Sequence, residues 1–130
     1  GPIMNAMSFV AIGVGAALGA WLRWGFGLWL NPLAGLIPMG TLVANLLGAY
    51  LIGVAVAVFH AQVDVSPEMR LFIITGFLGG LTTFSSFSAE VVALFQRAEY
   101  AWAVGTISLH LFGSLLMTVL GILSIQKLTQ

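Results

Sequence analysis

The sequence predicts an all-α integral membrane protein with four transmembrane helices, and three observations support this prediction. Of the 130 residues, 60% are hydrophobic and only 6% are charged, against roughly a quarter charged in an ordinary soluble domain. The few charged residues leave four long apolar stretches between them. A helix that crosses the bilayer core needs about 20 apolar residues, so each stretch is long enough to span a membrane.

The four predicted spans begin and end at residues that favour helix boundaries. In chain order the spans are residues 8–30, 39–60, 67–96 and 100–126. Asn31 with Pro32 ends the first span in a turn. Ser66 followed by Pro67 is typical of an N-cap and a first-turn proline, so the third span begins there. A tight connector of three residues, 97–99, leads into the fourth span.

The chain is predicted to form a single transmembrane domain, residues 1–130, with residues 1–7 as a flexible N-terminus. We interpret Gly1 and Pro2 as an expression-tag remnant, with Met4 or Met7 as the native start. The first apolar run lacks a preceding basic region, so we expect it to be a permanent span and not a cleaved signal. Zero net charge gives no sign of a nucleic-acid partner, and the lack of cysteine excludes disulfides and thiolate metal sites.

Small residues on the first span indicate a packing face. Ala11, Gly15 and Gly19 recur at every fourth position, and Arg23 continues the same row. Small residues at this spacing let membrane helices approach closely. Arg23 is then expected to point into protein or toward a watery mouth, because hydrocarbon disfavours its charge. Attraction of anions and simple snorkelling to the membrane surface both remain open for this residue.

The basic residues are balanced across the membrane. With four spans, Arg70 and Lys127 lie on one side, whereas Arg23 and Arg97 lie nearer the other. The positive-inside rule therefore gives no preferred orientation. Because four short helices enclose little space for a transport path, we predict a dual-topology antiparallel homodimer. A weakly biased protein that inserts one way is the alternative.

The middle of the third span has an unusual composition. Residues 75–88 contain six hydroxyl residues, together with the adjacent Gly79 and Gly80. Adjacent glycines are unfavourable inside a helix, so we predict that the third helix breaks near residues 79–83. Broken helices at the membrane midplane are where transporters and channels place ion sites, and freed carbonyl oxygens suit a hard cation such as sodium. A kinked helix with hydroxyls bonded to their own turn is the alternative.

Polar residues also form rows on the second and fourth spans. Thr41, Asn45 and Gly48 share one helix face, and Asn45 is expected either to bond a neighbouring helix or to contact a solute. The fourth span carries a polar residue at every fourth position: Thr106, His110, Ser114 and Thr118. Four polar residues on one face of a membrane helix favour the wall of a wet path over simple packing.

The groups along this predicted path are suited to an anion. They are amide, hydroxyl and imidazole donors, and Phe84 and Phe87 add ring edges with partial positive charge. Glu90 is the only deep acid, and no lysine lies at mid-membrane. Neutral donors can replace an anion's water without trapping the ion, as conduction requires. Composition does not name the anion.

The same residues carry a family resemblance. Residues 76–90, Gly-Phe-Leu-Gly-Gly-Leu-Thr-Thr-Phe-Ser-Ser-Phe-Ser-Ala-Glu, closely resemble the signature of the Fluc (CrcB) family of fluoride channels. Residues 40–45, residues 19–23 and the Gly113-Ser114 and Met117-Thr118 pairs extend the resemblance over all four spans. It implies an antiparallel homodimer with two pores, each lined by both subunits. It also implies passive export of fluoride through a bacterial inner membrane, with no enzyme chemistry and no organic cofactor.

The resemblance also implies roles for individual residues. Asn45 would donate its amide to fluoride, and Phe84 and Phe87 would supply ring edges along the path. A polar track would continue through Ser86, Ser114, Thr118, Thr41 and Glu90. The main-chain carbonyls of Gly79 and Thr82, from both subunits, would hold a structural sodium ion at the dimer centre. Arg23 would lie near the vestibule.

His110 departs from the family pattern, in which serine or tyrosine is expected at this position. An imidazole still donates one hydrogen bond, so conduction should survive. Its unperturbed pKa of about 6.5 would let it gain a charge in mild acid. We therefore predict a pH-dependent current between roughly pH 5 and 7, lost in His110→Ser.

Three other functions are weighed against the channel. A small dual-topology multidrug/proton antiporter needs an acid near mid-membrane, but the first span has none and Glu90 lies toward one end of the third. A structural subunit of a larger complex should show unbalanced charge and a polar docking segment, which this sequence lacks. A membrane enzyme is disfavoured because the sequence has no HExxH motif, no nucleophile with a base and no acid pair.

Overall fold

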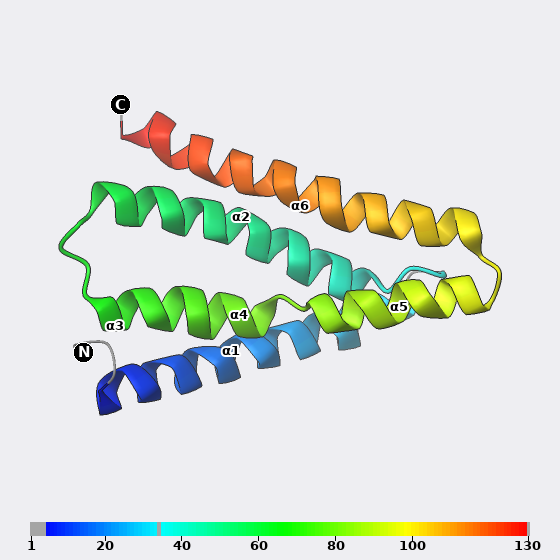
Figure 1. Ribbon diagram of the computed structural model, residues 1–130, viewed down its shortest axis with the longest axis horizontal. Helices are drawn as coiled ribbons and strands as arrows, with labels where there is room; N and C mark the ends of the chain where they lie inside the picture. Colours follow the sequence, from blue (N-terminus) through cyan, green and yellow to red (C-terminus); the bar gives the residue numbers. More distant parts are fainter. Residues whose placement is uncertain (1–4, 34, 130) are drawn as a thin grey trace.

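The computed structural model describes residues 5–33 and 35–129, which form an all-helical bundle (Figure 1). The elements in chain order are α1 (Ala6–Leu30), η1 (Asn31–Leu33), α2 (Met39–Ala61), α3 (Pro67–Arg70), η2 (Leu71–Leu78), α4 (Gly79–Leu81), α5 (Phe84–Gln96) and α6 (Tyr100–Leu128). Here η1 is a short 3-10 helix and η2 is a π-helix. The segments from α3 to α5 follow one another along a common line and make up the third span.

Four segments are long and apolar enough to cross a membrane: Ala6–Leu33, Met39–Ala61, Pro67–Gln96 and Tyr100–Leu128. The four predicted spans are thus confirmed, and the helix ends agree with the predicted ends within two residues. Helix α1 begins at Ala6, so Met7 is already helical, whereas the proposed start at Met4 lies outside the described residues. The start of α1, the end of α6 and the α2–α3 loop lie at one end of the bundle, opposite the α5–α6 connection (Figure 1).

The helix boundaries follow from local capping. Asn5 is the N-cap of α1, where its side-chain oxygen accepts from the Ser8 amide at 2.7 Å. Ser66 accepts from the Met69 amide at 3.2 Å, with Pro67 in the first turn, as the sequence predicted. The connector between α5 and α6 reverses the chain through Ala98, whose φ of 59° is in the left-handed region. The Asn5 and Ser66 side chains thereby satisfy first-turn amides that have no partner within their own helix.

Close helix packing positions the third span. Gly15 and Gly19 of α1 are buried, and a Cβ on Gly19 would overlap the Phe77 carbonyl oxygen in η2. The predicted small-residue face on the first span therefore packs against the third span, where backbone meets backbone. Helix α2 lies along α6 on the other side of the bundle (Figure 1). Ala44, Leu78 and Leu81 form a buried core cluster between α2 and the third span.

Much of the outer surface is apolar. Large side chains that are more than half exposed include Trp21, Trp24, Trp29, Phe84 and Phe112. An apolar surface this extensive is unfavourable in water and requires lipid or another protein surface. The bundle therefore fits a membrane environment.

Candidate functional site

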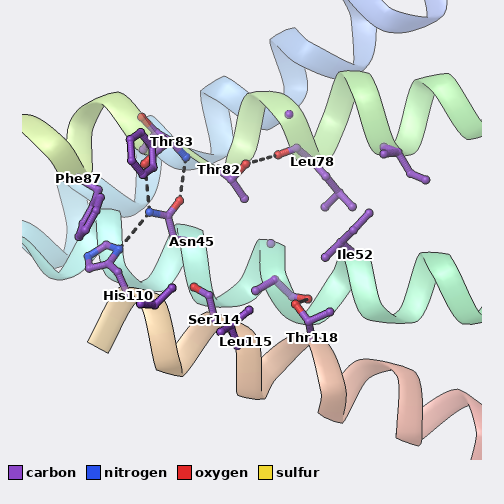
Figure 2. A pocket seen from close by; sticks show the side chains of 16 residues that line it. Asn45, Ile52, Leu78, Thr82, Thr83, Phe87, His110, Ser114, Leu115 and Thr118 are labelled. Atoms are coloured by element: carbon purple, nitrogen blue, oxygen red, sulfur yellow. Dashed lines mark hydrogen bonds between the residues drawn. The ribbon is translucent and has the colours of Figure 1, made fainter. Parts of the chain in front are cut away.

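The third span loses its helical hydrogen bonds at Thr83, and Asn45 replaces them. Thr82 and Thr83 have extended backbone, with ψ of 155° and 112°, between α4 and α5. Asn45 Nδ2 donates to the Thr83 carbonyl at 3.1 Å, and Asn45 Oδ1 accepts from the Thr83 amide at 2.7 Å (Figure 2). A backbone N–H only donates and a carbonyl only accepts, so these two bonds fix which way round the Asn45 amide lies.

Thr83 also caps the helix that follows. Its hydroxyl oxygen accepts from the Ser86 amide at 3.1 Å and donates to the Ser86 hydroxyl at 3.0 Å. The side chain is only 8% exposed. Our sequence reasoning did not single out Thr83, although a threonine just before a helical stretch is a common N-cap. Through Asn45 on one side and Ser86 on the other, Thr83 is the residue on which the start of α5 depends.

This bonding leaves two carbonyl oxygens without the donors of a continuous helix. The Thr83 amide donates to Asn45 instead of to the Gly79 carbonyl. The Ser86 amide donates to the Thr83 hydroxyl instead of to the Thr82 carbonyl. Carbonyl oxygens are ligands that hard cations take, so Gly79 and Thr82 fit the type of donor expected for sodium.

His110 completes the arrangement around Asn45. Asn45 Nδ2 also lies 3.1 Å from His110 Nδ1, within hydrogen-bonding distance. The His110 ring is 5% exposed and lies against the Phe87 ring, with centroids 4.6 Å apart. The Phe84 ring follows, with its centroid 5.6 Å from that of Phe87. Three rings therefore follow one another from the buried imidazole to Phe84, which is 80% exposed.

A groove of about 520 Å³ runs beside these residues (Figure 2). Most of the site residues predicted from the sequence line this groove: Asn45, Gly79, Thr82, Phe84, Phe87, His110, Ser114 and Thr118. Apolar residues such as Ile52, Leu78 and Leu115 form the rest of its wall, and Figure 2 shows them beyond Asn45 toward Thr118. Sequence reasoning missed these apolar members, because nothing distinguishes a groove-lining leucine from one that faces lipid.

Not every polar residue of the fourth span faces this groove. Thr106 is fully buried and donates to the Trp102 carbonyl of its own helix at 2.7 Å, so its prediction as part of the wall is wrong. Thr118 lines the groove, but its hydroxyl donates to the Ala49 carbonyl on α2 at 2.9 Å. The row therefore combines helix packing with groove lining, because a hydroxyl in a membrane helix readily bonds a nearby carbonyl.

The remaining predicted residues lie around a second, smaller pocket of about 340 Å³. Arg23, Thr41 and Ser86 line it, together with Trp24, Gly27, Leu28 and Asn31. Arg23 is half-buried, and its Nε donates to the Gly80 carbonyl at 3.1 Å, which ties it to the third span. Thr41 Oγ1 donates to Glu90 Oε2 at 2.6 Å. Glu90 thus joins this group through Thr41, although it lines neither pocket.

Four long apolar helices, of which the second, third and fourth spans line a groove of neutral hydrogen-bonding groups, define a multi-pass membrane protein. A family model described as "CrcB-like protein, Camphor Resistance (CrcB)" matches residues 10–122. The chain belongs to this CrcB family, and the resemblance stated from its motifs is confirmed.

Three similar proteins carry the name "Fluoride-specific ion channel FluC". The chain is 59% identical to that of Nitrosospira multiformis over 98% of this chain and 99% of the relative. It is 60% identical to that of Pseudomonas putida over 88% of this chain and 91% of the relative. For Albidiferax ferrireducens the identity is 61%, over 89% and 88% of the two chains. These relatives are named as ion channels and not as enzymes, in agreement with the prediction that this chain is not an enzyme.

Proposed function

We propose that this protein is a fluoride-selective channel. The observation that carries the proposal is the chemistry of the larger groove. Among its described lining residues none is Asp, Glu, Lys or Arg, and its polar groups are the amide, imidazole and hydroxyls of Asn45, His110, Thr82, Thr83, Ser114 and Thr118. A pore needs such moderate binding, because an ion must enter and also leave. The names of the similar proteins supply the identity of the anion.

The ring series supports passage of a partly dehydrated anion. Ring edges carry partial positive charge, and the Phe84 and Phe87 rings are tilted by 56° to each other, so that edges as well as faces are presented. A small halide would pass from the exposed Phe84 along Phe87 toward Asn45 and His110. Ser86, Ser114, Thr118, Thr41 and Glu90 would continue the polar track, and Arg23 would draw anions into the vestibule.

The exposed side of the groove supports an antiparallel homodimer. Phe84 is 80% exposed and Gly79 is also exposed in the single chain, although both line the groove. A second copy in the opposite orientation would cover this side and complete two pores related by symmetry. The Gly79 and Thr82 carbonyls of both copies would then hold a structural sodium ion where the interrupted third spans meet.

The direction of transport follows from the membrane potential. A potential of 100 mV is worth about 2.3 kcal/mol for one elementary charge, and a bacterial cytoplasm is negative inside. An anion therefore moves passively outward through an open pore in the inner membrane. No coupling ion or enzyme step is required.

Fluoride efflux from proteoliposomes tests the proposal. Liposomes loaded with potassium fluoride and reconstituted with the wild-type chain should release fluoride to an external electrode when valinomycin clamps the potential and no proton gradient is applied. The same liposomes loaded with potassium chloride should release chloride far more slowly. Protein-free liposomes give the background leak. Equal fluoride and chloride release, or transport only with an imposed proton gradient, would contradict a fluoride channel, and the second result would favour an antiporter.

A further inference from the structure

The hydrogen bonds of Asn45 determine which tautomer His110 adopts. The Thr83 amide and carbonyl fix the orientation of the Asn45 amide, so the atom facing His110 is Nδ2, which only donates. His110 Nδ1 must therefore accept, and the hydrogen of the neutral ring lies on Nε2. The three contacts of Asn45, two with Thr83 and one with His110, together fix the tautomer of the neutral ring.

His110 Nε2–H is then a buried donor without a partner. Nδ1 and Nε2 lie on opposite sides of the imidazole, so Nε2 faces away from Asn45. In the described part of the chain Nε2 is shielded from solvent and makes no hydrogen bond. Leaving such a donor unsatisfied is unfavourable, and an unsatisfied polar group in a native structure calls for an explanation. The imidazole lies against the Phe87 ring, whose edge carries the partial positive charge that suits an anion.

We propose that His110 binds the permeating fluoride through Nε2–H, with Asn45 holding the ring in the tautomer that makes this possible. The proposal rests on the fluoride channel proposed above and assigns one ligand atom within it. Asn45 in this arrangement acts on the anion through His110, because both of its Nδ2 hydrogens are already engaged.

Two substitutions of His110 separate its two nitrogen atoms. In His110→Gln the longer side chain places an amide N–H near the Nε2 position and can no longer accept from Asn45 in the same way. In His110→Asn the oxygen lies near the Nδ1 position and accepts from Asn45, but no donor reaches the Nε2 position. His110→Phe keeps a ring and removes both functions. Exposed His60, in the last turn of α2, offers His60→Gln as a matched control.

The proposal predicts a specific order of fluoride efflux rates. His110→Gln and His60→Gln should stay within about three-fold of wild type, whereas His110→Asn and His110→Phe should lose about ten-fold or more, as expected for a lost hydrogen bond to a charged group. Wild-type rates in His110→Asn would show that Nε2–H is not needed and would overturn the proposal. If His110→Gln and His110→Asn are both inactive, the efflux rates do not distinguish the two nitrogen atoms, and nitrogen NMR of His110 decides between them.

Nitrogen NMR of histidine reads the tautomer and the ligand directly. His60→Gln protein labelled with ¹⁵N-histidine contains His110 as its single histidine. At pH 8 its spectrum should show a protonated Nε2 and an unprotonated Nδ1, and sodium fluoride should shift the Nε2–H resonance while equal sodium chloride does not. A protonated Nδ1, or no response to fluoride, would overturn the proposal. Absence of fluoride efflux from the wild type would instead refute the proposed function itself.

Discussion

Asn45 on α2 pairs with both backbone groups of Thr83, its Oδ1 2.7 Å from the amide and its Nδ2 3.1 Å from the carbonyl, across 38 positions in the chain. One side chain thereby supplies the hydrogen bonds that a continuous third helix would have made at this point. Because an unsatisfied backbone group is costly in a membrane, the interrupted third span depends on this residue. The pairing also fixes the direction of the amide that faces His110.

Replacing Asn45 by aspartate should stop conduction. Asn45→Asp keeps an acceptor for the Thr83 amide but loses both hydrogens of Nδ2 and adds a negative charge beside the groove. We expect fluoride efflux to fall about 100-fold, since an unpaired buried charge and an unsatisfied carbonyl each cost several-fold in binding. Asn5→Asp keeps its N-cap acceptor role but loses the exposed 3.4 Å contact of Asn5 Nδ2 with Glu68 Oε1. Because Asn5 lines neither pocket, this variant should conduct like wild type. Normal efflux from Asn45→Asp would remove this residue from the pore.

The ring edges of Phe84 are predicted to matter although the side chain is exposed in a single chain. Phe84→Ile keeps an apolar side chain and removes the aromatic rim, so fluoride efflux should fall about ten-fold or more. Phe112, also exposed and absent from the residues that line the groove, serves as the matched control. The measurement is electrode-detected efflux from proteoliposomes. Equal rates for Phe84→Ile and Phe112→Ile would contradict an aromatic contribution.

Mild acid should reduce the fluoride current through His110. Protonation places a hydrogen on Nδ1, which can then no longer accept from Asn45, and a cation beside the path would hold the anion too strongly for fast release. Two other charged groups lie near Thr41, which is one helical turn from Asn45 on α2. Glu90 accepts a hydrogen bond from Thr41, and Arg23 lines the same pocket as Thr41.

The pH response is measured as channel current in planar bilayers. We expect the wild-type current to fall about two-fold or more as the pH decreases from 7 to 5. His110→Ser should give a flat profile over the same interval. An unchanged pH response in His110→Ser would assign it to another group. Currents from protein-free bilayers correct for hydrogen fluoride that crosses the lipid without the channel.

The packing of α1 against the third span should be sensitive to a single methyl group. A Cβ on Gly19 would overlap backbone atoms of Phe77 and Leu81, so Gly19→Ala should destabilise the fold by about 1–3 kcal/mol. Gly13, on the same helix, has open space at its Cβ position, and Gly13→Ala should leave stability unchanged or slightly higher. Unfolding in detergent followed by tryptophan fluorescence compares them. Equal stability of the two variants would show that this contact is looser than described.

A stabilising substitution is predicted at Ala98. This residue has φ of 59°, while the Glu99 amide donates to the Leu94 carbonyl at 2.8 Å and the Ala98 amide to the Phe95 carbonyl at 3.0 Å. This is the Schellman pattern at a helix C-terminus, in which glycine is favoured. Ala98→Gly should raise the free energy of unfolding by about 1 kcal/mol, without changing fluoride efflux. A lower free energy of unfolding for Ala98→Gly than for the wild type would contradict this prediction.

The spans were predictable because their signals are local. An apolar run must be long enough to cross the bilayer, and caps such as Ser66 with Pro67 act on amides within their own first turn. It was predictable that another helix approaches α1 closely at Gly15 and Gly19, because small residues at every fourth position indicate a contact face. The identity of the partner helix was not predictable, because many helices could use such a face.

What the sequence by itself determined is therefore the membrane class, the ends of the four helices and the chemical types gathered for a path. Only the tertiary structure decided that Asn45 holds Thr83, that His110 contacts Asn45 through Nδ1, and that Thr106 is buried while Ser114 lines the groove. The physical reason is that a hydrogen bond between helices depends on the rotation of each helix about its axis and on the distance between them. Neither quantity is encoded in the period of one helix, whereas length and capping are.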